Sequence, residues 1–272
     1  MKPSPLSLQA VVFDWAGTVI DFGSLAPMDA FVQLFARYGV RIDVAEARVP
    51  MGLAKWDHIH ALGHAPRIAA EWLRVHGRPF DDADCDTLYE VFTPMNAASV
   101  RDHAQLIPGA LDTVLALRAR GLKIGSTTGY NRPIMDVVQP LAAAQGYVPD
   151  NLVCAGDMAS ARPGPLMMVR TLSDLQVWPP AAVVKVDDTV PGLQEGRAIG
   201  CWVVGLAISG NTLGLTPAQW QATPEPEQQR LRAQATAELL DGGAHYVIDS
   251  VADLLPVLET IDTRLARGER PD

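Results

Sequence analysis

Several features that mark other protein classes are scarce or missing in this sequence. Cysteine occurs three times, at Cys85, Cys154 and Cys201, at distant positions and in no Cys-x-x-Cys pattern. Basic residues number 22 against 31 acidic ones, which gives a formal net charge of −9. No hydrophobic run approaches the roughly 20 residues of a membrane-spanning helix. These absences argue against a disulfide framework, a nucleic-acid-binding surface and a membrane protein.

The composition that remains is that of a compact globular protein. Hydrophobic residues make up 48% of the 272 residues and charged residues 19%, which is ordinary for one large domain or two modest ones. The N-terminal residues Met1–Pro5 lead into the first strand within a few residues, so we expect no secretory signal there. Together with the unpaired cysteines, this predicts a cytoplasmic protein.

Short β-branched segments alternate with helix-length amphipathic ones along most of the chain. This alternation predicts the α/β class, with a doubly wound parallel sheet. The expected strands are Gln9–Trp15, Lys123–Thr128, Asn151–Ala155, Ala181–Asp187, Cys201–Ala207 and Ala244–Ile248. The helices expected between them are Gly109–Arg120, Arg132–Gln145, Pro165–Leu175 and Val190–Ile199.

The interval from about residue 21 to about residue 107 breaks this rhythm, because it contains helical patterns and no convincing strand. We expect these helices to form an inserted all-helical cap domain, residues 22–103, over a core domain of residues 1–21 and 104–272. Beyond Gly210, the Pro- and Gln-rich stretch Thr216–Gln229 resembles a surface excursion, and the polar tail Arg264–Asp272 is expected to fray. The cap helices are expected at Met28–Tyr38, Val44–Ala47, Leu53–Leu62, Pro66–Val75 and Asp82–Val100.

Four polar positions follow expected strands and should meet at the carboxyl edge of the sheet. Asp14 ends the first strand, and Thr128 with Gly129 ends the second, where a hydroxyl and a backbone N–H can bind phosphate oxygens. Arg162 precedes a proline that starts a helix, and its guanidinium suits a phosphoryl group. Asp188 ends another apolar strand and, with Asp14, offers the oxygen ligands that Mg²⁺ prefers.

The order of these four positions resembles the haloacid dehalogenase superfamily of phosphotransferases. The resemblance implies that Asp14 attacks phosphorus to form an aspartyl-phosphate, that Mg²⁺ offsets charge, and that Thr128 and Arg162 hold the phosphoryl oxygens. Relatives that hydrolyse esters carry a second aspartate two residues after the first, which protonates the leaving group. Ala16 stands at that position and cannot donate a proton.

A leaving group that receives no proton can be a carbanion if its electrons flow into a protonated imine. Lys55 and His58 lie three residues apart on one face of an expected helix, and a lysine amine can form such an imine. Together with Ala16, they make the chain similar to the phosphonatases, the branch of the superfamily that cleaves carbon–phosphorus bonds. The segments that carry this similarity include Asp14–Thr18, Met51–Lys55, Gly125–Tyr130, Ala161–Pro163 and Gly200–Trp202.

The phosphonatase resemblance implies a function and a set of residue roles. The expected reaction is hydrolysis of the carbon–phosphorus bond of phosphonoacetaldehyde, a small-molecule phosphonate, with Mg²⁺ as cofactor and a homodimer as the assembly. The lysine that forms the Schiff base is Lys55, and Met51, His58 and Tyr130 border the aldehyde end of the substrate. The Ala16 carbonyl would join Asp14 and Asp188 around the metal.

One position departs from the family pattern near the expected metal. The family often has another aspartate four residues after the one that matches Asp188, and here that position is Gly192. Asp187, where many relatives have glycine, is a candidate to compensate through a water molecule. The nucleophile is therefore better defined by the sequence than the metal shell.

Three alternatives stay open at this point. A conventional phosphate-ester phosphatase of the same fold would hydrolyse sugar phosphates and would not need Lys55. A non-catalytic sensor of a phosphorylated ligand would keep the scaffold without the chemistry, although the full set of polar residues argues against it. A zinc site at His58, His60 and His64 is disfavoured, because only His60 and His64 share a helix face. No Gly-x-Gly-x-x-Gly follows the first strand, which sets aside a dinucleotide-binding oxidoreductase.

Overall fold

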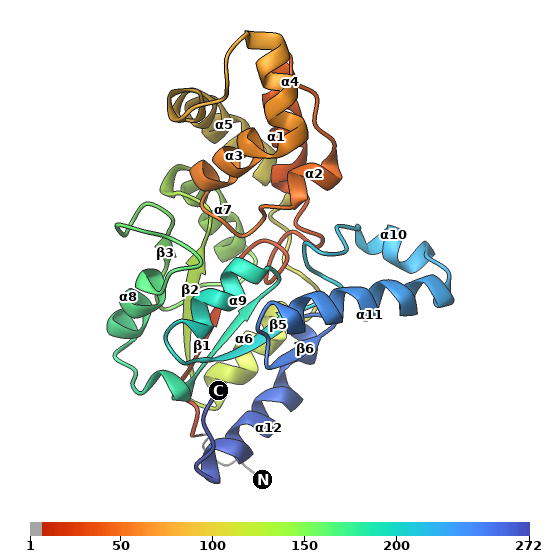
Figure 1. Ribbon diagram of the computed structural model, residues 1–272. Helices are drawn as coiled ribbons and strands as arrows, with labels where there is room; N and C mark the ends of the chain where they lie inside the picture. The colour runs from red at the N-terminus through yellow and green to blue at the C-terminus, as the bar shows by residue number, and fades with distance from the viewer. Residues whose placement is uncertain (1–6) are drawn as a thin grey trace.

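The computed structural model describes residues 7–272, and in this range the chain forms a six-stranded sheet with the strand order β3-β2-β1-β4-β5-β6 (Figure 1). Each pair of neighbouring strands is parallel, which confirms the predicted α/β fold. The expectation for Met1–Pro5 lies outside the described residues. The strands are β1 (Ala10–Phe13), β2 (Lys123–Thr128), β3 (Val153–Cys154), β4 (Val183–Asp187), β5 (Trp202–Leu206) and β6 (Tyr246–Ile248).

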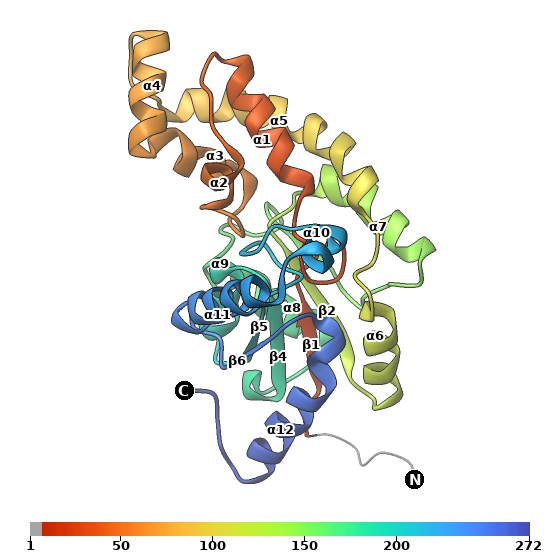
Figure 2. The same ribbon diagram turned by 90° about the vertical axis from the view of Figure 1, so that its right-hand side faces the viewer.

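Helices cover both faces of the sheet, which is why β1, β4 and β5 are buried along their whole length. One face packs against α6 (Ala110–Ala119), α7 (Arg132–Ala144) and α12 (Leu254–Ala266). The other packs against α8 (Leu166–Leu175), α9 (Val190–Arg197) and α11 (Glu225–Asp241) (Figure 2). This two-sided cover is that of a doubly wound sheet.

Five helices between β1 and β2 stand together beyond the carboxyl ends of the strands (Figure 1). They bury a hydrophobic cluster of their own, separate from the clusters on the two faces of the sheet. We call residues 22–103 the five-helix segment. Its helices are α1 (Ala26–Arg37), α2 (Val44–Arg48), α3 (Lys55–His64), α4 (Pro66–His76) and α5 (Asp82–His103).

The two stretches of chain that enter and leave the five-helix segment lie side by side. The Asp21 N–H donates to the Gln105 carbonyl at 3.1 Å, and Ile20 forms an isolated antiparallel bridge with Leu106. His103 Nδ1 lies 3.4 Å from Asp21 Oδ1, and this contact raises the pKa of the imidazole. The segment is therefore attached to the sheet through one narrow double connection.

Two expectations for the C-terminal third need correction. The stretch Thr216–Gln229 lies at the surface, but it is helical: α10 (Pro217–Ala222) begins with a Thr216–Gln219 capping box, and α11 begins at Glu225. The tail expected from Arg264 begins inside α12 (Leu254–Ala266). Arg264 lies 4.5 Å above the Trp202 ring and donates to the Tyr246 hydroxyl at 2.9 Å, which holds the end of α12 on the sheet.

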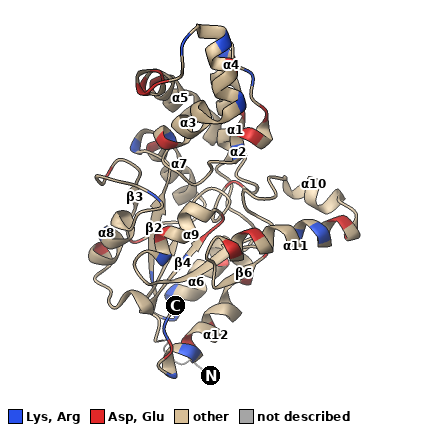
Figure 3. Ribbon diagram, viewed as in Figure 1, with Lys and Arg blue, Asp and Glu red and all other residues tan. Residues whose placement is uncertain are grey.

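Positions of acidic and basic residues are interspersed along the ribbon (Figure 3). Blue and red positions alternate along the five-helix segment and along α11. Within residues 7–272, every helix is either too short or too polar to span a lipid bilayer.

Helix α6 offers a matched pair of leucines for a test of the packing. Leu117 is fully buried in the core cluster, whereas Leu115, on the same helix, is 54% exposed. We expect Leu117→Ala to lower the free energy of unfolding by about 2–5 kcal/mol and Leu115→Ala to change it by less than about 0.5 kcal/mol. Urea denaturation measures both, and equal effects would contradict the described packing of α6.

Candidate active site

Two aspartates lie where the sheet changes its winding direction. From β1 the chain builds β2 and β3 on one side, and it then crosses to build β4, β5 and β6 on the other. In such sheets, the carboxyl ends of the strands at this crossing frame the ligand-binding crevice. Asp14 follows β1 directly and Asp188 follows β4 directly, and both carboxyl groups are buried.

The same aspartates form the group best suited to a metal ion. Among the described residues, Asp14, Asp187 and Asp188 form the group that offers three ligand atoms within 4.8 Å of one another. Oδ1 of Asp188 is buried without a hydrogen-bond partner, and Oδ2 accepts from the Asn211 N–H at 2.8 Å. Burial, followed by the neighbouring carboxylates, raises the pKa of Asp14 to about 6 and that of Asp188 well above its ordinary value. These oxygen ligands fit a divalent cation.

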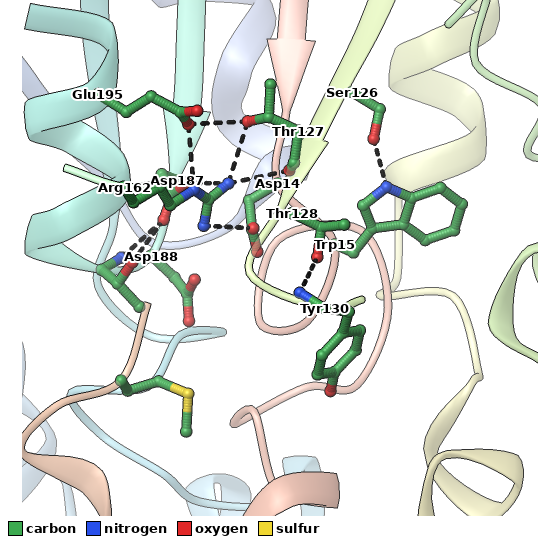
Figure 4. Close-up of polar contacts among 12 residues, drawn as sticks. Asp14, Trp15, Ser126, Thr127, Thr128, Tyr130, Arg162, Asp187, Asp188 and Glu195 are labelled. Atoms are coloured by element: carbon green, nitrogen blue, oxygen red, sulfur yellow. Dashed lines mark hydrogen bonds and ion pairs between the residues drawn. The ribbon is translucent and has the colours of Figure 1, made fainter. Parts of the chain in front are cut away.

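Arg162 connects the carboxylates of three different elements (Figure 4). Its guanidinium lies 2.8 Å from Asp14 Oδ1, 3.3 Å from Asp187 Oδ2 and 3.0 Å from Glu195 Oε2. Arg162 also donates to the Thr127 carbonyl at 2.9 Å. The residue is almost fully buried, so these ion pairs are shielded from water and hold the Asp14 carboxylate in place.

The buried charges around Arg162 do not balance. Four buried carboxylates stand beside three buried basic residues, Arg162, Lys185 and Lys55. An excess of buried negative charge is costly unless a cation compensates for it. A divalent ion would offset the remaining negative charge, and the Asp188 oxygen without a hydrogen-bond partner is a candidate ligand for it. The carboxylates are Asp14, Asp187, Asp188 and Glu195.

Asp187 explains why position 192 is occupied by a glycine. The Asp187 carboxylate fills the space above Gly192, and a Cβ atom at that glycine would overlap it. Asp187 accepts from the Thr189 N–H at 3.0 Å and from its hydroxyl at 2.8 Å, and it forms an ion pair with Lys185 at 3.0 Å. A side chain at position 192 and an aspartate at position 187 therefore exclude each other.

Thr128 and Gly129 lie at the end of β2, beside the aspartates. The Thr128 Oγ1 accepts from the Tyr130 N–H at 3.0 Å, which leaves its hydroxyl hydrogen free to donate. A Cβ atom at Gly129 would stand 2.8 Å from the Leu53 carbonyl oxygen, closer than a side chain permits. The glycine therefore allows the five-helix segment to approach the sheet at this point.

Lys55 is the first residue of α3, and its amine is buried where the five-helix segment meets the sheet. The Nζ atom lies 5.2 Å from the centre of the Tyr130 ring and 5.7 Å from that of Phe31, and it donates to the Met51 Sδ at 3.8 Å. Burial in these surroundings lowers the pKa of Lys55 to about 8, despite the opposing attraction of Asp14 and Asp188. A lysine with this pKa is a usable nucleophile near neutral pH.

His58 lies one helical turn behind Lys55 and is not among the residues that line the cavity. Its ring stacks on Phe31 with the centroids 3.9 Å apart, and its Nε2 lies 2.8 Å from the Ala47 carbonyl oxygen. Burial holds the pKa of His58 well below its ordinary range. The structure therefore places His58 in the support of α3, while Lys55, Met51 and Tyr130 reach the cavity.

The cavity between the sheet and the five-helix segment is small, about 20 Å³, and it collects the other residues singled out from the sequence. Ser24, Pro27, Gly52 and Thr189 also line it. The position of Ser24 at the start of the cap and that of Gly52 within the segment Met51–Lys55 had pointed to the pocket, whereas Pro27 had no sequence signal. A further residue, Lys185, did carry a signal, since it is a lysine between valines in a buried strand. The expected residues at the cavity are Asp14, Ala16, Met51, Lys55, Thr128, Gly129, Tyr130, Arg162 and Asp188.

The histidines considered as zinc ligands make other contacts. His60 and His64 stack with their ring centres 4.1 Å apart, and His60 Nε2 lies 3.3 Å from Asp82. The three cysteines are buried and form no disulfide.

Comparison with known proteins places the chain in a family. Residues 8–200 match the family of haloacid dehalogenase-like hydrolases, and the chain belongs to this family. It is thus a hydrolase, and its relatives generally use a divalent metal. A β-phosphoglucomutase from Clostridium difficile, 14% identical with a TM-score of 0.66 over 96% of this chain and 99% of that one, shares the fold.

Proteins with higher sequence identity to this chain include phosphonoacetaldehyde hydrolases. A phosphonoacetaldehyde hydrolase from Paraburkholderia xenovorans is 51% identical over 97% of this chain and 99% of its own length. One from Vibrio cholerae is 47% identical over the whole of both chains. The crystal structure of a phosphonoacetaldehyde hydrolase-like protein from Oleispira antarctica has a TM-score of 0.96 and 43% identity, and it covers 100% of this chain and 99% of its own.

The lowered pKa of Lys55 makes its reactivity testable. Only the neutral amine attacks a carbonyl, so trapping of acetaldehyde on Lys55 by borohydride should rise with pH through a midpoint near pH 8 and level off about one pH unit above it. At pH 7 about one tenth of the amine is neutral, against less than about a thousandth at the ordinary lysine pKa. Mass spectrometry of the Lys55 peptide gives the profile. A midpoint near 10.5 would contradict the buried setting described here.

Proposed function

We propose that this protein hydrolyses the carbon–phosphorus bond of phosphonoacetaldehyde to acetaldehyde and phosphate, with Mg²⁺ as its cofactor. The observation that carries the proposal is a buried lysine of lowered pKa in the same cavity as Asp14, with Ala16 where an acid would stand. The relatives named phosphonoacetaldehyde hydrolase, which this chain matches over nearly its full length, support it.

The reaction begins at the aldehyde. The neutral Lys55 amine adds to the carbonyl carbon, water leaves, and a protonated imine forms. One oxygen of Asp14 then attacks phosphorus on the side opposite the carbon. The electron pair of the breaking carbon–phosphorus bond flows into the imine, which becomes an enamine, while the phosphoryl group stays on Asp14. The imine therefore takes the part that a proton donor takes in ester hydrolysis, which explains why Ala16 is tolerated.

Two hydrolyses complete the turnover. The enamine takes up a proton at carbon and returns to the imine, and water then releases acetaldehyde and the free Lys55 amine. A second water attacks the aspartyl-phosphate and releases phosphate, so that one water is consumed overall. The divalent ion, held by Asp14, Asp188 and the Ala16 carbonyl, supplies positive charge beside the phosphoryl oxygens.

The remaining residues of the cavity hold the substrate. Arg162 is positioned to contact both Asp14 and a bound phosphoryl group, which brings nucleophile and electrophile together. The Thr128 hydroxyl and the Gly129 N–H are assigned to the phosphoryl oxygens. Met51 and Tyr130 border the aldehyde end, and His58 supports Lys55 from behind. In this arrangement His58 acts on the site through α3 rather than on the substrate.

The five-helix segment acts in this proposal as a cap domain, residues 22–103, over a core domain of residues 1–21 and 104–272. Its own hydrophobic cluster and its narrow double connection to the sheet support this division. We further place the protein in the cytoplasm as a homodimer. The three unpaired cysteines support the location, and the assembly rests on family resemblance and is open to size-exclusion chromatography.

Replacing the imine-forming lysine should stop the reaction without unfolding the protein. We expect Lys55→Arg to lower acetaldehyde and phosphate release by about 1,000-fold or more, because arginine keeps the charge but cannot form the imine. Both products are assayed together after incubation with phosphonoacetaldehyde and Mg²⁺. Near-normal release by this variant, or faster turnover of p-nitrophenyl phosphate than of the phosphonate, would favour an ester phosphatase instead.

Removing the nucleophile should separate the two covalent steps. In Asp14→Asn, phosphate release should fall by about 1,000-fold or more, while borohydride should still trap the substrate on Lys55, because imine formation precedes phosphoryl transfer. Mass spectrometry of the trapped peptide and a phosphate assay give the two readings. Loss of phosphate release also excludes a sensor without catalytic activity, whereas undiminished release would show that another group attacks phosphorus.

A further inference from the structure

The cavity that holds the reacting groups is small in this position of the cap. Its volume of about 20 Å³ accommodates little more than one water molecule by the same measure. If phosphonoacetaldehyde is the substrate, as proposed above, the cap must move away from the sheet to admit it and return before Lys55 and Asp14 can act together. The contacts that hold the closed position therefore decide how well the two nucleophiles are aligned.

Arg48, the last residue of α2, makes polar contacts with the start of the five-helix segment and, beyond the segment, with the loop after β5. Its Nη1 donates to the Gly23 carbonyl at 3.0 Å and to the Asn211 side-chain oxygen at 3.0 Å. The same nitrogen reaches the Asn211 carbonyl at 3.3 Å, and Nη2 reaches the Gly214 carbonyl at 3.4 Å. One guanidinium thus joins α2 to the connection after β1 and to the loop after β5.

The loop after β5 is shaped to receive this guanidinium. Gly214 has a φ of +61°, which favours glycine, and a Cβ atom there would overlap the Arg48 side chain. Every acceptor that Arg48 uses is neutral, and burial lowers the pKa of the guanidinium. Asp21 and Asp188 attract the guanidinium without an ion-pair contact, so its direct partners are all carbonyl oxygens. Its five fixed donors suit it instead to hold several backbone segments in one geometry.

The same end of α2 is tied to the catalytic lysine. The Met51 N–H donates to the Arg48 carbonyl at 3.0 Å, so a hydrogen-bonded turn runs from Arg48 directly to a residue of the cavity. His58, on the helix that begins with Lys55, contacts the Ala47 carbonyl at 2.8 Å. A displacement of Arg48 would therefore move both Met51 and Lys55 relative to the sheet.

The other end of the contact reaches a predicted metal ligand. Asn211, which accepts from Arg48 through two oxygens, donates its own N–H to Asp188 Oδ2 at 2.8 Å. The Asp188 oxygen that has no partner is then left to face the cavity. Arg48, Asn211 and Asp188 form a continuous chain of hydrogen bonds from the cap to the centre of the core site.

We propose that Arg48 is a positioning residue that latches the closed cap onto the loop 211–214, and so sets Lys55 over Asp14 and orients Asp188 through Asn211. It touches neither the substrate nor the reacting atoms. Its effect passes through the turn to Met51 and Lys55 on one side and through the Asn211 backbone on the other. The latch forms only in the closed cap, so it stabilises the aligned state rather than the open one.

The experiment compares Arg48→Ala and Arg48→Lys with Arg37→Ala, an exposed arginine on α1 of the same segment. Arg48→Ala should lower kcat by about 100-fold with a smaller change in KM, since alignment rather than ground-state binding is lost. Borohydride trapping on Lys55 should slow in parallel. Arg48→Lys should recover only part of both, because an ammonium cannot reach all the carbonyls. Arg37→Ala should match the parent protein in each measurement.

A second measurement does not depend on the substrate. Hydrogen–deuterium exchange of the peptide that covers residues 208–216 should become about fivefold faster in Arg48→Ala and stay unchanged in Arg37→Ala. If the parent protein cleaves no phosphonate but this exchange difference appears, the proposed function fails and the latch stands. If the phosphonate is cleaved and Arg48→Ala behaves like Arg37→Ala in both kinetics and exchange, the latch is wrong and the function stands.

Asn211→Ala tests the connection to Asp188. It removes the side-chain oxygen that accepts from Arg48 but keeps the N–H that binds Asp188. Calorimetric titration with Mg²⁺ alone should therefore give an affinity within about twofold of the parent protein, while kcat falls about tenfold. A loss of Mg²⁺ affinity as large as that of kcat would contradict the separate roles assigned to the two groups of Asn211.

Discussion

The site depends on the way negative charge is buried at the crossing between β1 and β4. The fold brings four carboxylates together there and supplies Arg162 and Lys185 as buried counter-charges. Desolvation has a larger effect on the pKa of Asp14 than the attraction of Arg162, since this pKa stays raised even though Arg162 lies 2.8 Å away. The arrangement therefore favours a divalent cation, and it leaves one oxygen of Asp188 without a protein partner to receive it. A fully neutralised site would have no such affinity.

The same balance of effects decides the state of Lys55. Asp14 and Asp188 favour the ammonium form, whereas burial and the positive charge of Arg162 favour the neutral amine. Burial is the larger effect, and the pKa settles at about 8. This outcome requires the cap to be closed, because the aromatic rings of Phe31 and Tyr130, from the cap and the core, exclude water from both sides of the amine. Chemistry at the lysine is thus coupled to the geometry of closure.

The sequence predicted the parallel sheet and the aspartates at its carboxyl edge, because strand patterns and the residues that end them are visible in short stretches of sequence. The β-branched runs that become β1 and β4 end in acids, and parallel strands bring their carboxyl ends to one edge. The sequence is less informative where tertiary contacts decide. The capping box at Thr216 made a helix of a proline-rich stretch, and the Trp202 ring held Arg264. His58 shares a helical face with Lys55, yet the ring turns onto Phe31, which spacing along the chain cannot reveal.

At two positions the family resemblance leads to the expectation of a carboxylate and this chain has none, and the structure accounts for the two positions differently. At Gly192 the reason is geometric, since Asp187 fills the same space from the neighbouring strand and supplies the charge to the network of Arg162 and Lys185. At Ala16 no other acid takes the place among the residues that line the cavity beside it; the group that comes nearest in function is the amine of Lys55. One substitution therefore conserves the electrostatics of the site, whereas the other changes which bond the site can break.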